Sequence, residues 1–262
     1  MKVTICCITK NEDIHLERLI NNIRDISENI IIVDSFSEDQ TQKIAHKYNC
    51  FFYQRIFDNF SNQKNFCLSK VQDGNKWVLF LDADEFISDE LKNEIKSLNS
   101  LSTTYDAYKF KRKFFWKNTW IKRGYYPLWF LRLGRKKYIK FDDNKINEHM
   151  LCSTNKIGIL KGYFIDYNLK NTKSWFAKHN LYANMEANRF FLKNENAPKR
   201  ILWNKLPLVI RPFMLIFYRL FIKLSVLDGA KAVQYHFYHD LIYRLMIDIK
   251  IIKKKLTIIK KE

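Results

Sequence analysis

Residues 77–85 of this chain read Trp77-Val78-Leu79-Phe80-Leu81-Asp82-Ala83-Asp84-Glu85, an apolar run that ends abruptly in three carboxylates. The apolar part predicts a strand buried in a sheet that is covered on both faces. Unpaired charge is costly beside such a strand, so the acidic residues need a counter-charge. A divalent cation that holds a substrate phosphate would supply it, because hard cations prefer oxygen ligands. A solvated acidic turn is the alternative explanation of this short motif.

The first hundred residues alternate strand and helix signals, which predicts a parallel sheet with helical crossovers. We expect strands at residues 3–8, 30–33, 50–54 and 77–81, and helices at about residues 11–23, 40–48, 61–70 and 89–98. Asn11 and Ser61 are expected to cap the first and third helices. Asp39 and Thr41 are expected to cap the second helix and not to bind substrate.

The sequence changes character after residue 105. Up to residue 165 it is β-rich, aromatic and basic, with strands expected at residues 128–133 and 157–160. A long helix is expected at residues 171–193, and an amphipathic helical tail from residue 206. We therefore divide the chain into an α/β part at residues 1–105, a β-rich part of the same domain at 106–165, and a helical C-terminal region at 166–262.

The composition describes a globular protein, with 47% hydrophobic and 28% charged residues among 262. The five cysteines show no CxxC spacing, which favours reduced thiols in a cytoplasmic protein. The start of the chain lacks the features of a signal peptide. No unbroken membrane span is expected, because Arg211, Pro212, Arg219 and Lys223 interrupt the most apolar stretch, residues 206–224.

A net charge of +19 indicates an anionic partner. Basic residues are dense at 109–140 and 250–261. The first region favours an anionic acceptor over nucleic acid, since no RNA-binding signature is present. The tail suits an anionic membrane surface, with Arg211, Arg219 and Lys223 reaching headgroups, or else packs as a terminal helix on its own domain. A peripheral location on the inner face of the cytoplasmic membrane is therefore expected.

Polar side chains follow three of the predicted strands at the point where each strand ends. In an open parallel sheet, ligands bind outside the carboxyl ends of the strands. These ends carry Thr9, Asn11 and Glu12, then Asp34 and Ser35, and then Asp82, Asp84 and Glu85. A whole set of such groups predicts a binding site at one edge of the sheet.

Four of these segments resemble the successive motifs of family 2 glycosyltransferases, which have the GT-A fold. The segments are Thr9-Lys10-Asn11-Glu12, residues 33–41, Gln63-Lys64-Asn65-Phe66 and Leu81-Asp82-Ala83-Asp84-Glu85. The chain is similar in particular to bacterial lipopolysaccharide core glucosyltransferases, which carry an HE-containing segment after the basic β region. Here that segment reads Ile146-Asn147-Glu148-His149-Met150, with Asn147 where the subgroup carries histidine. The segments Lys178-His179-Asn180-Leu181-Tyr182 and Glu186-Ala187 resemble the same subgroup.

The resemblance implies roles for individual residues. It places Asp34 on the uracil of a UDP-sugar, with Thr9, Asn11 and Glu12 in the same nucleoside pocket. It places Asp82 near the ribose and the metal, and it makes Asp84 a ligand of Mg²⁺ or Mn²⁺ at the diphosphate. Further residues complete the set: Lys64 and Asn65 as nucleotide or diphosphate contacts, Glu148 as the general base of an inverting transfer, and His149 as a further metal ligand.

The function expected from these features is transfer of a hexose, glucose from UDP-glucose, to a lipid-linked or phosphorylated saccharide such as lipopolysaccharide core. A metal-dependent nucleotidyltransferase would share the acidic strand ends, but no Gly-rich triphosphate loop is present. A non-catalytic protein that binds nucleic acid or membrane is the other alternative.

Overall fold

The computed structural model describes residues 3–72, 77–98, 103–142, 149–191 and 203–259. The chain forms two compact units. The sheet unit comprises residues 1–115 and 127–169, and the helical unit comprises residues 116–126 and 170–262. Glu148 and Asn147 lie outside the described residues.

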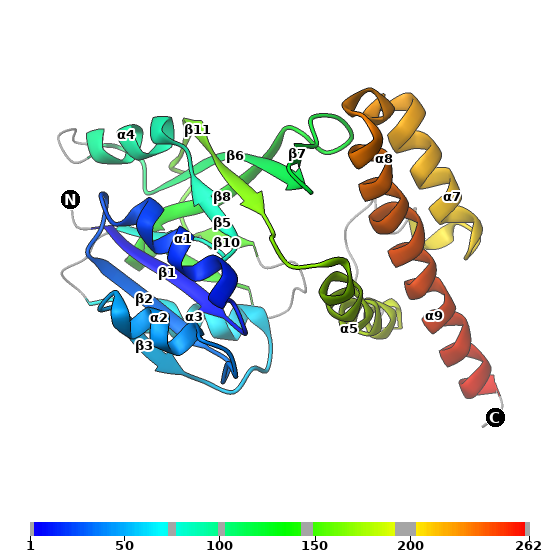
Figure 1. Cartoon of the computed structure of the whole chain (residues 1–262), viewed down its shortest axis with the longest axis horizontal. Coiled ribbons are helices and arrows are strands. Elements are labelled where there is room, and N and C mark those ends of the chain that lie inside the picture. Colours follow the sequence, from blue (N-terminus) through cyan, green and yellow to red (C-terminus); the bar gives the residue numbers. More distant parts are fainter. Residues whose placement is uncertain (1–2, 73–76, 99–102, 143–148, 192–202, 260–262) are drawn as a thin grey trace. The chain divides into compact units, whose positions relative to one another are not determined.

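The first half of the sheet unit alternates strands and helices as predicted (Figure 1). Its elements are β1 (Val3–Thr9), α1 (Asp13–Ile23), β2 (Asn29–Asp34), α2 (Thr41–Lys47), β3 (Phe51–Gln54), α3 (Phe60–Ser69) and β4 (Trp77–Phe80). The strands pair in parallel in the order β3-β2-β1-β4. The register sets Thr9 beside Asp34, at the carboxyl ends of β1 and β2.

The second half extends the sheet with mixed pairing. Its elements are β5 (Glu85–Ile87), α4 (Asp89–Ser97), β6 (Ala107–Trp116), β8 (Leu128–Arg135), η1 (Lys136–Tyr138), β9 (Ile139–Phe141), β10 (Met150–Cys152) and β11 (Ile157–Tyr167). The sheet continues β4-β8-β6-β11-β5, while β9 and β10 form a separate antiparallel pair. β8 is antiparallel to β4 and β6, and β11 is parallel to β6. The GT-A fold expected from the sequence is confirmed.

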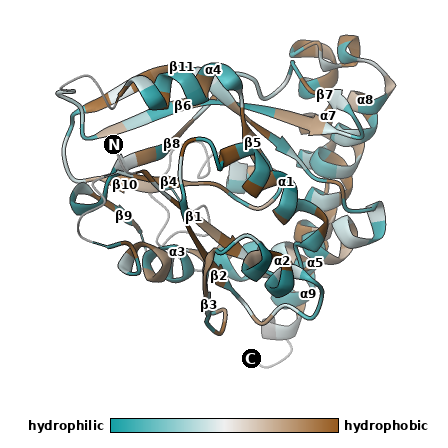
Figure 2. Cartoon of the chain, turned by 60° about the vertical axis from the view of Figure 1, so that its left-hand side comes forward, coloured by the Kyte–Doolittle hydropathy of each residue, from teal (hydrophilic) through white to brown (hydrophobic). Residues whose placement is uncertain are grey.

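The core lies on both faces of the parallel strands, because alternate side chains of each strand point in opposite directions. In β1, Ile5 and Cys7 join one buried cluster with helix α1, whereas Cys6 joins another with Cys67 of α3. Figure 2 shows hydrophobic residues concentrated along β1 and β2. Four of the five cysteines are buried, and all five are free thiols.

The helix caps agree only in part with those expected. Asn11 does not cap α1: its backbone is left-handed, with φ 54°, and its side-chain oxygen accepts from the Glu38 N–H at 2.8 Å. Asp39 caps α2 as expected and serves α1 as well, since it accepts from the first N–H groups of both helices, those of Thr41 at 2.9 Å and Asp13 at 3.1 Å. One carboxylate therefore serves the starts of both α1 and α2. A helical cap was expected of Thr41 as well, but its hydroxyl accepts from the Glu12 N–H at 2.8 Å.

Helix α3 is capped by Asn59 and not by Ser61. The Asn59 side chain accepts from the Asn62 N–H at 2.8 Å, which places it two positions before the expected cap. Ser61 is buried, and its hydroxyl donates to the Asp142 carbonyl at 2.7 Å. Both residue types can cap a helix, so sequence pattern alone does not choose between them.

The helical unit contains β7 (Thr119–Trp120), α5 (Thr172–Phe190), α7 (Ile210–Phe217), the π-helix η2 (Tyr218–Ile222), the 3-10 helix η3 (Ser225–Asp228), α8 (Ala230–His236), the π-helix η4 (Phe237–Ile242) and α9 (Tyr243–Ile259). Ala183 and Ala187 of α5 pack against Tyr243, Ile247 and Ile251 of α9. The small alanines let the two helices approach closely. The C-terminal helix thus packs on its own unit. Within the described ranges, no helix is long and apolar enough to cross a membrane.

Candidate active site

Two loops leave the carboxyl ends of β1 and β2, and they are tied to each other. Asp34 is fully buried at their junction. Its carboxylate accepts from the Thr9 hydroxyl at 2.8 Å and from the Ser37 N–H at 2.6 Å. The Asn11 N–H donates to the Ser37 hydroxyl at 2.7 Å. The structure thus brings Thr9, Asn11 and Asp34 together, as their strand-end positions predict.

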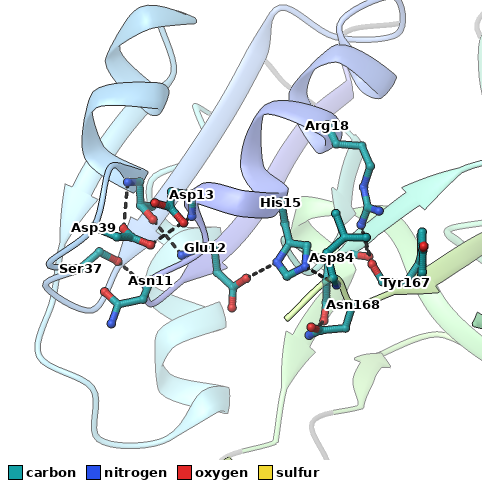
Figure 3. A network of polar contacts seen from close by, with 12 residues as sticks. Asn11, Glu12, Asp13, His15, Arg18, Ser37, Asp39, Asp84, Tyr167 and Asn168 are labelled. Atoms are coloured by element: carbon teal, nitrogen blue, oxygen red, sulfur yellow. Dashed lines mark hydrogen bonds and ion pairs between the residues drawn. The ribbon is translucent and has the colours of Figure 1, made fainter. Parts of the chain in front are cut away.

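Glu12 is held by a histidine that sequence reasoning did not select. His15, fully buried in α1, places Nδ1 2.6 Å from a Glu12 carboxylate oxygen (Figure 3). The Leu169 N–H donates to Nε2 of the same ring at 2.8 Å. A nitrogen that accepts carries no proton, so the neutral ring bears its proton on Nδ1 and donates it to Glu12. His15 therefore orients the Glu12 side chain.

Asp84 lies where α1, the start of β5 and the end of β11 meet. The Asn168 amide donates to Asp84 Oδ2 at 2.8 Å. The Arg18 guanidinium donates to the carbonyls of Asp84 at 3.0 Å and Tyr167 at 2.6 Å (Figure 3). The backbone around Asp84 is therefore fixed by two other elements. Its second carboxylate oxygen, Oδ1, makes no hydrogen bond to the residues that the structure describes.

Asp82 and Glu85 share the guanidinium of Arg132, a residue of β8. Arg132 Nη2 lies 3.2 Å from Asp82 Oδ2 and 2.8 Å from Glu85 Oε1. Lys64 Nζ lies 3.4 Å from the other Asp82 oxygen. Glu85 also accepts from the Asp82 N–H at 2.8 Å. Two cations from α3 and β8 therefore neutralise the acidic end of β4.

The two carboxylates on Arg132 differ in acidity. Desolvation alone would raise the pKa of Asp82, but the charges of Lys64 and Arg132 outweigh it and hold that pKa below the ordinary value. Burial raises the pKa of Glu85 well above its ordinary value, and the neighbouring Asp82 adds to the effect, while Arg132 opposes it. Asp82 is thus the ionised partner of the two basic groups. Opposed shifts of this kind are common at functional sites.

Asn65 is engaged with backbone. Its amide donates to the Phe141 carbonyl and its oxygen accepts from the Phe141 N–H, both at 2.9 Å. This pair of bonds clamps α3 to β9. Lys64, which precedes it, is buried and points to Asp82. Of these two predicted nucleotide contacts, the structure brings Lys64 to the acidic cluster and ties Asn65 to β9.

A cavity of about 290 Å³ opens beside Arg132. It is lined by Lys109, Trp129, Phe130, Leu131, Arg132, Phe141, His149, Met150 and Ile157. His149 is exposed, and its ring centroid lies 6.4 Å from that of Phe130. Because Arg132 both lines the cavity and binds the carboxylates, the cavity adjoins the acidic end of β4.

Comparison with known proteins identifies the family. The model of glycosyl transferase family 2 matches residues 4–164, which include every residue of this site up to β11. The chain belongs to glycosyl transferase family 2. It is 30% identical over 198 residues to an uncharacterized glycosyltransferase of Rickettsia typhi, covering 71% of this chain and 67% of that protein. A homologue from Rickettsia prowazekii, also named an uncharacterized glycosyltransferase, is 29% identical over 197 residues, with the same coverage.

A solved structure shares the fold of this glycosyltransferase. Residues 1–349 of Staphylococcus aureus TarS superpose with a TM-score of 0.50 at 18% identity, covering 97% of this chain and 92% of that one. At that identity the likeness concerns the fold. The acidic end of β4 therefore belongs to a glycosyltransferase of family 2, and sugar transfer is the activity of this family.

The residues of this glycosyltransferase fit a divalent cation held largely by its substrate. Within the described part of the chain, no group of three or more His, Cys, Asp or Glu side chains could hold a metal. Both Asp82 oxygens lie in ion pairs, whereas Asp84 keeps one oxygen free of hydrogen bonds to described residues. Mg²⁺ is commonly bound by one or two carboxylates together with substrate phosphates. Asp84 suits that arrangement.

Sequence reasoning missed Arg132, and a signal for it existed. Arg132 is a lone charge in the apolar run from Leu128 to Leu133. A charged side chain on an apolar strand is almost always paired, so the position of Arg132 predicts an acidic partner. Arg18 and Asn168 gave no such signal. Arg18 binds a backbone carbonyl, which no sequence pattern marks, and Asn168 binds Asp84, which lies 84 positions away. His15 was hidden by its place on the buried face of an amphipathic helix.

Proposed function

We propose that this glycosyltransferase transfers a hexose from a UDP-sugar, with UDP-glucose as the first candidate donor, and inverts the anomeric centre. The observation that carries the proposal is the cluster at the end of β4, where Asp82 and Glu85 share Arg132 and Asp84 stands beside them. A nucleotide diphosphate brings two or more negative charges, and Lys64 with Arg132 supplies fixed cations nearby. Such preorganised charge favours a departing diphosphate.

The nucleoside is assigned to the paired loops after β1 and β2. Asp34, an acceptor when ionised, is the proposed partner of the uracil N–H. Thr9 and Ser37 hold that carboxylate in place, and Asn11 and Glu12 complete the pocket wall. His15 supports this assignment because it fixes the position of the Glu12 side chain. The His15 ring is itself held by a hydrogen bond from the Leu169 N–H.

A divalent cation, Mg²⁺ or Mn²⁺, is proposed on Asp84, with His149 as a further ligand. When bound, the cation would neutralise charge on the diphosphate. Asn168 fixes one Asp84 oxygen and leaves the other for this contact. His149 projects from the segment that precedes β10, and its exposure leaves it accessible.

The acceptor is assigned to the cavity beside Arg132. Its aromatic and basic lining suits a saccharide that carries a phosphate, since rings offer flat contact surfaces and Lys109 offers charge. A lipid-linked or phosphorylated saccharide such as lipopolysaccharide core is the proposed class. Glu148, one residue before the cavity residue His149, is the proposed general base.

Replacing Asp84 by asparagine tests the donor site. We expect Asp84→Asn to lose the Mn²⁺-dependent part of UDP-glucose binding, because it removes the negative charge at the proposed metal contact. Transfer should fall by at least about a hundredfold, as for other single electrostatic contacts. The measurement is the thermal shift with UDP-glucose, with and without Mn²⁺. Asp89→Asn, on a side chain that is 93% exposed, is the control. Equal metal-dependent shifts in Asp84→Asn and the parent would contradict the assignment.

Replacing Glu148 by glutamine tests the acceptor side. Glutamine keeps the size of the side chain but cannot take a proton, so we expect transfer to fall about 10²–10⁴-fold. UDP-glucose binding should stay at the parent level, because a base acts on the acceptor. Single-turnover transfer and donor titration measure the two effects separately. Near-parent transfer in Glu148→Gln would assign the base to another residue, and a loss of donor binding would place Glu148 on the nucleotide.

A further inference from the structure

Six apolar side chains form one exposed face along α7 and η2. They are Ile210, Phe213, Met214, Phe217, Phe221 and Ile222, and we call them the α7 apolar face. Each is between 51% and 62% exposed. Their spacing of three, four and seven residues puts them on one side of the helix. An exposed apolar stripe of this size is unusual on a soluble protein and marks an interaction surface.

The orientation of this face is fixed by a buried ion pair on the opposite side of α7. Arg211 is 2% exposed, and its Nε lies 3.0 Å from a carboxylate oxygen of Asp248, which is 1% exposed. The Val209 N–H donates to the other Asp248 oxygen at 3.0 Å. Turning α7 to bury its apolar face would expose and break this pair. The apolar residues are therefore held outward.

The ion pair corrects one expectation. Arg211 does not reach headgroups, because it is paired with Asp248. Arg219 is also engaged: it donates to the Gly124 carbonyl, and its guanidinium lies 4.0 Å from the centre of the Tyr125 ring. Lys223, at the end of η2, is exposed. The burial of Arg211 was not predictable, because an amphipathic pattern does not show where a carboxylate 37 residues away will lie.

The C-terminal part of the chain is strongly basic. Residues 170–262 contain 19 Lys and Arg but only 6 Asp and Glu. Three of those acids, Asp228, Asp240 and Asp248, have side chains no more than 1% exposed and are paired within the helical unit. Among the described residues of this span, lysines such as Lys205, Lys223 and Lys231 are exposed, whereas these three acids are not. An anionic surface is the electrostatic complement of this basic part of the chain.

We propose that the α7 apolar face inserts into the headgroup boundary of an anionic lipid bilayer. Phenylalanine, isoleucine and methionine supply the apolar contact, and Lys223 with other exposed lysines of the helical unit supplies attraction to lipid phosphates. A helix over residues 210–222 is roughly 20 Å long, whereas the hydrocarbon core is about 30 Å thick, so the segment lies in the interface and does not cross it. The proposal does not depend on the proposed sugar transfer.

A second copy of the chain fits this face less well than lipid does. Association through the same face would bring two strongly positive units together, and like charges repel at low ionic strength. Lipid offers both an apolar layer and negative charge. We therefore commit to the bilayer as the occupant and treat self-association as a competing outcome of the experiment.

Vesicle flotation of the full chain tests the proposal. The vesicles contain phosphatidylcholine with about 30% phosphatidylglycerol, or phosphatidylcholine alone. The variant is Phe213→Ser/Phe217→Ser/Phe221→Ser, and Phe217→Ser alone serves if the triple variant does not fold. A matched control, Phe51→Ser/Ile56→Ser/Ile159→Ser, removes three exposed apolar side chains from the sheet unit. Thermal unfolding confirms that each variant is folded.

We expect the parent and the control to float with anionic vesicles, and the triple variant to partition at least about tenfold less. Binding should also weaken in about 1 M salt, where the screening length falls to about 3 Å. Flotation of the triple variant like the parent, no flotation of the parent, or equal binding to neutral vesicles would each overturn the proposal. A concentration-dependent dimer that the triple variant abolishes would overturn it in favour of self-association.

Discussion

Arg132→Met is expected to abolish sugar transfer and to destabilise the sheet unit by about 1–3 kcal/mol. The Arg132 side chain is 12% exposed and binds Asp82 and Glu85 together, and the Glu85 side chain is only 3% exposed. Without Arg132, the cation that the described residues still place beside these carboxylates is Lys64, on the Asp82 side. Removing the guanidinium leaves a buried oxygen of Glu85 without its hydrogen-bond partner, and an unsatisfied buried polar group costs about 1–3 kcal/mol.

Two measurements separate the parts of this prediction. Urea unfolding gives the loss of stability, and UDP-glucose titration of the folded variant gives the loss of donor binding. Arg55→Met is the matched control, since Arg55 pairs with Asp58 at the surface and such pairs contribute little. An Arg132→Met variant with parent stability and parent transfer would show that the acidic end of β4 does not need its guanidinium.

Arg211→Met is expected to destabilise the helical unit by about 3–5 kcal/mol, since it leaves Asp248 buried without its cation. The double variant Arg211→Met/Asp248→Leu should recover most of that loss, because an apolar pair of similar volume removes the stranded charge. Thermal or urea unfolding of the single and double variants measures both effects. Lys223→Met, on an exposed side chain of the same helical segment, is the control. A double variant no more stable than Arg211→Met would mean that the salt bridge is not the cause.

The parallel half of the fold was predictable because its strands are apolar runs buried on both faces. Ile31, Val33, Val78 and Leu79 are all buried, and such runs leave no alternative to a covered sheet. β5 was not predictable, since it has three residues and begins at the acidic Glu85. The role of Asp39 at the start of α2 was predictable, but its second role at the start of α1 was not, because a local pattern treats the two helices separately.

The acidic part of the site was predictable, but its partners were not. Asp82 and Asp84 follow directly from the end of an apolar strand, and Thr9 and Asp34 from paired strand ends. Arg132 and Asn168 come from β8 and from the residue after β11, which the sheet order brings to β4 and β5. A sequence pattern reports neighbours along the chain, whereas these contacts span 47 and 84 residues.

The dispersal of these groups along the chain has a consequence for shortened forms of the protein. A fragment ending before residue 128 would retain Thr9, Asp34, Lys64, Asp82 and Asp84. It would lack the strand that carries Arg132 and the amide of Asn168, so Glu85 would lose its cation and Asp84 its orienting partner. The recognisable sequence motifs end at Glu85, but the residues that hold their carboxylates in place extend to Leu169. The smallest unit to engineer, shuffle between relatives or graft is therefore the whole span from β1 to Leu169.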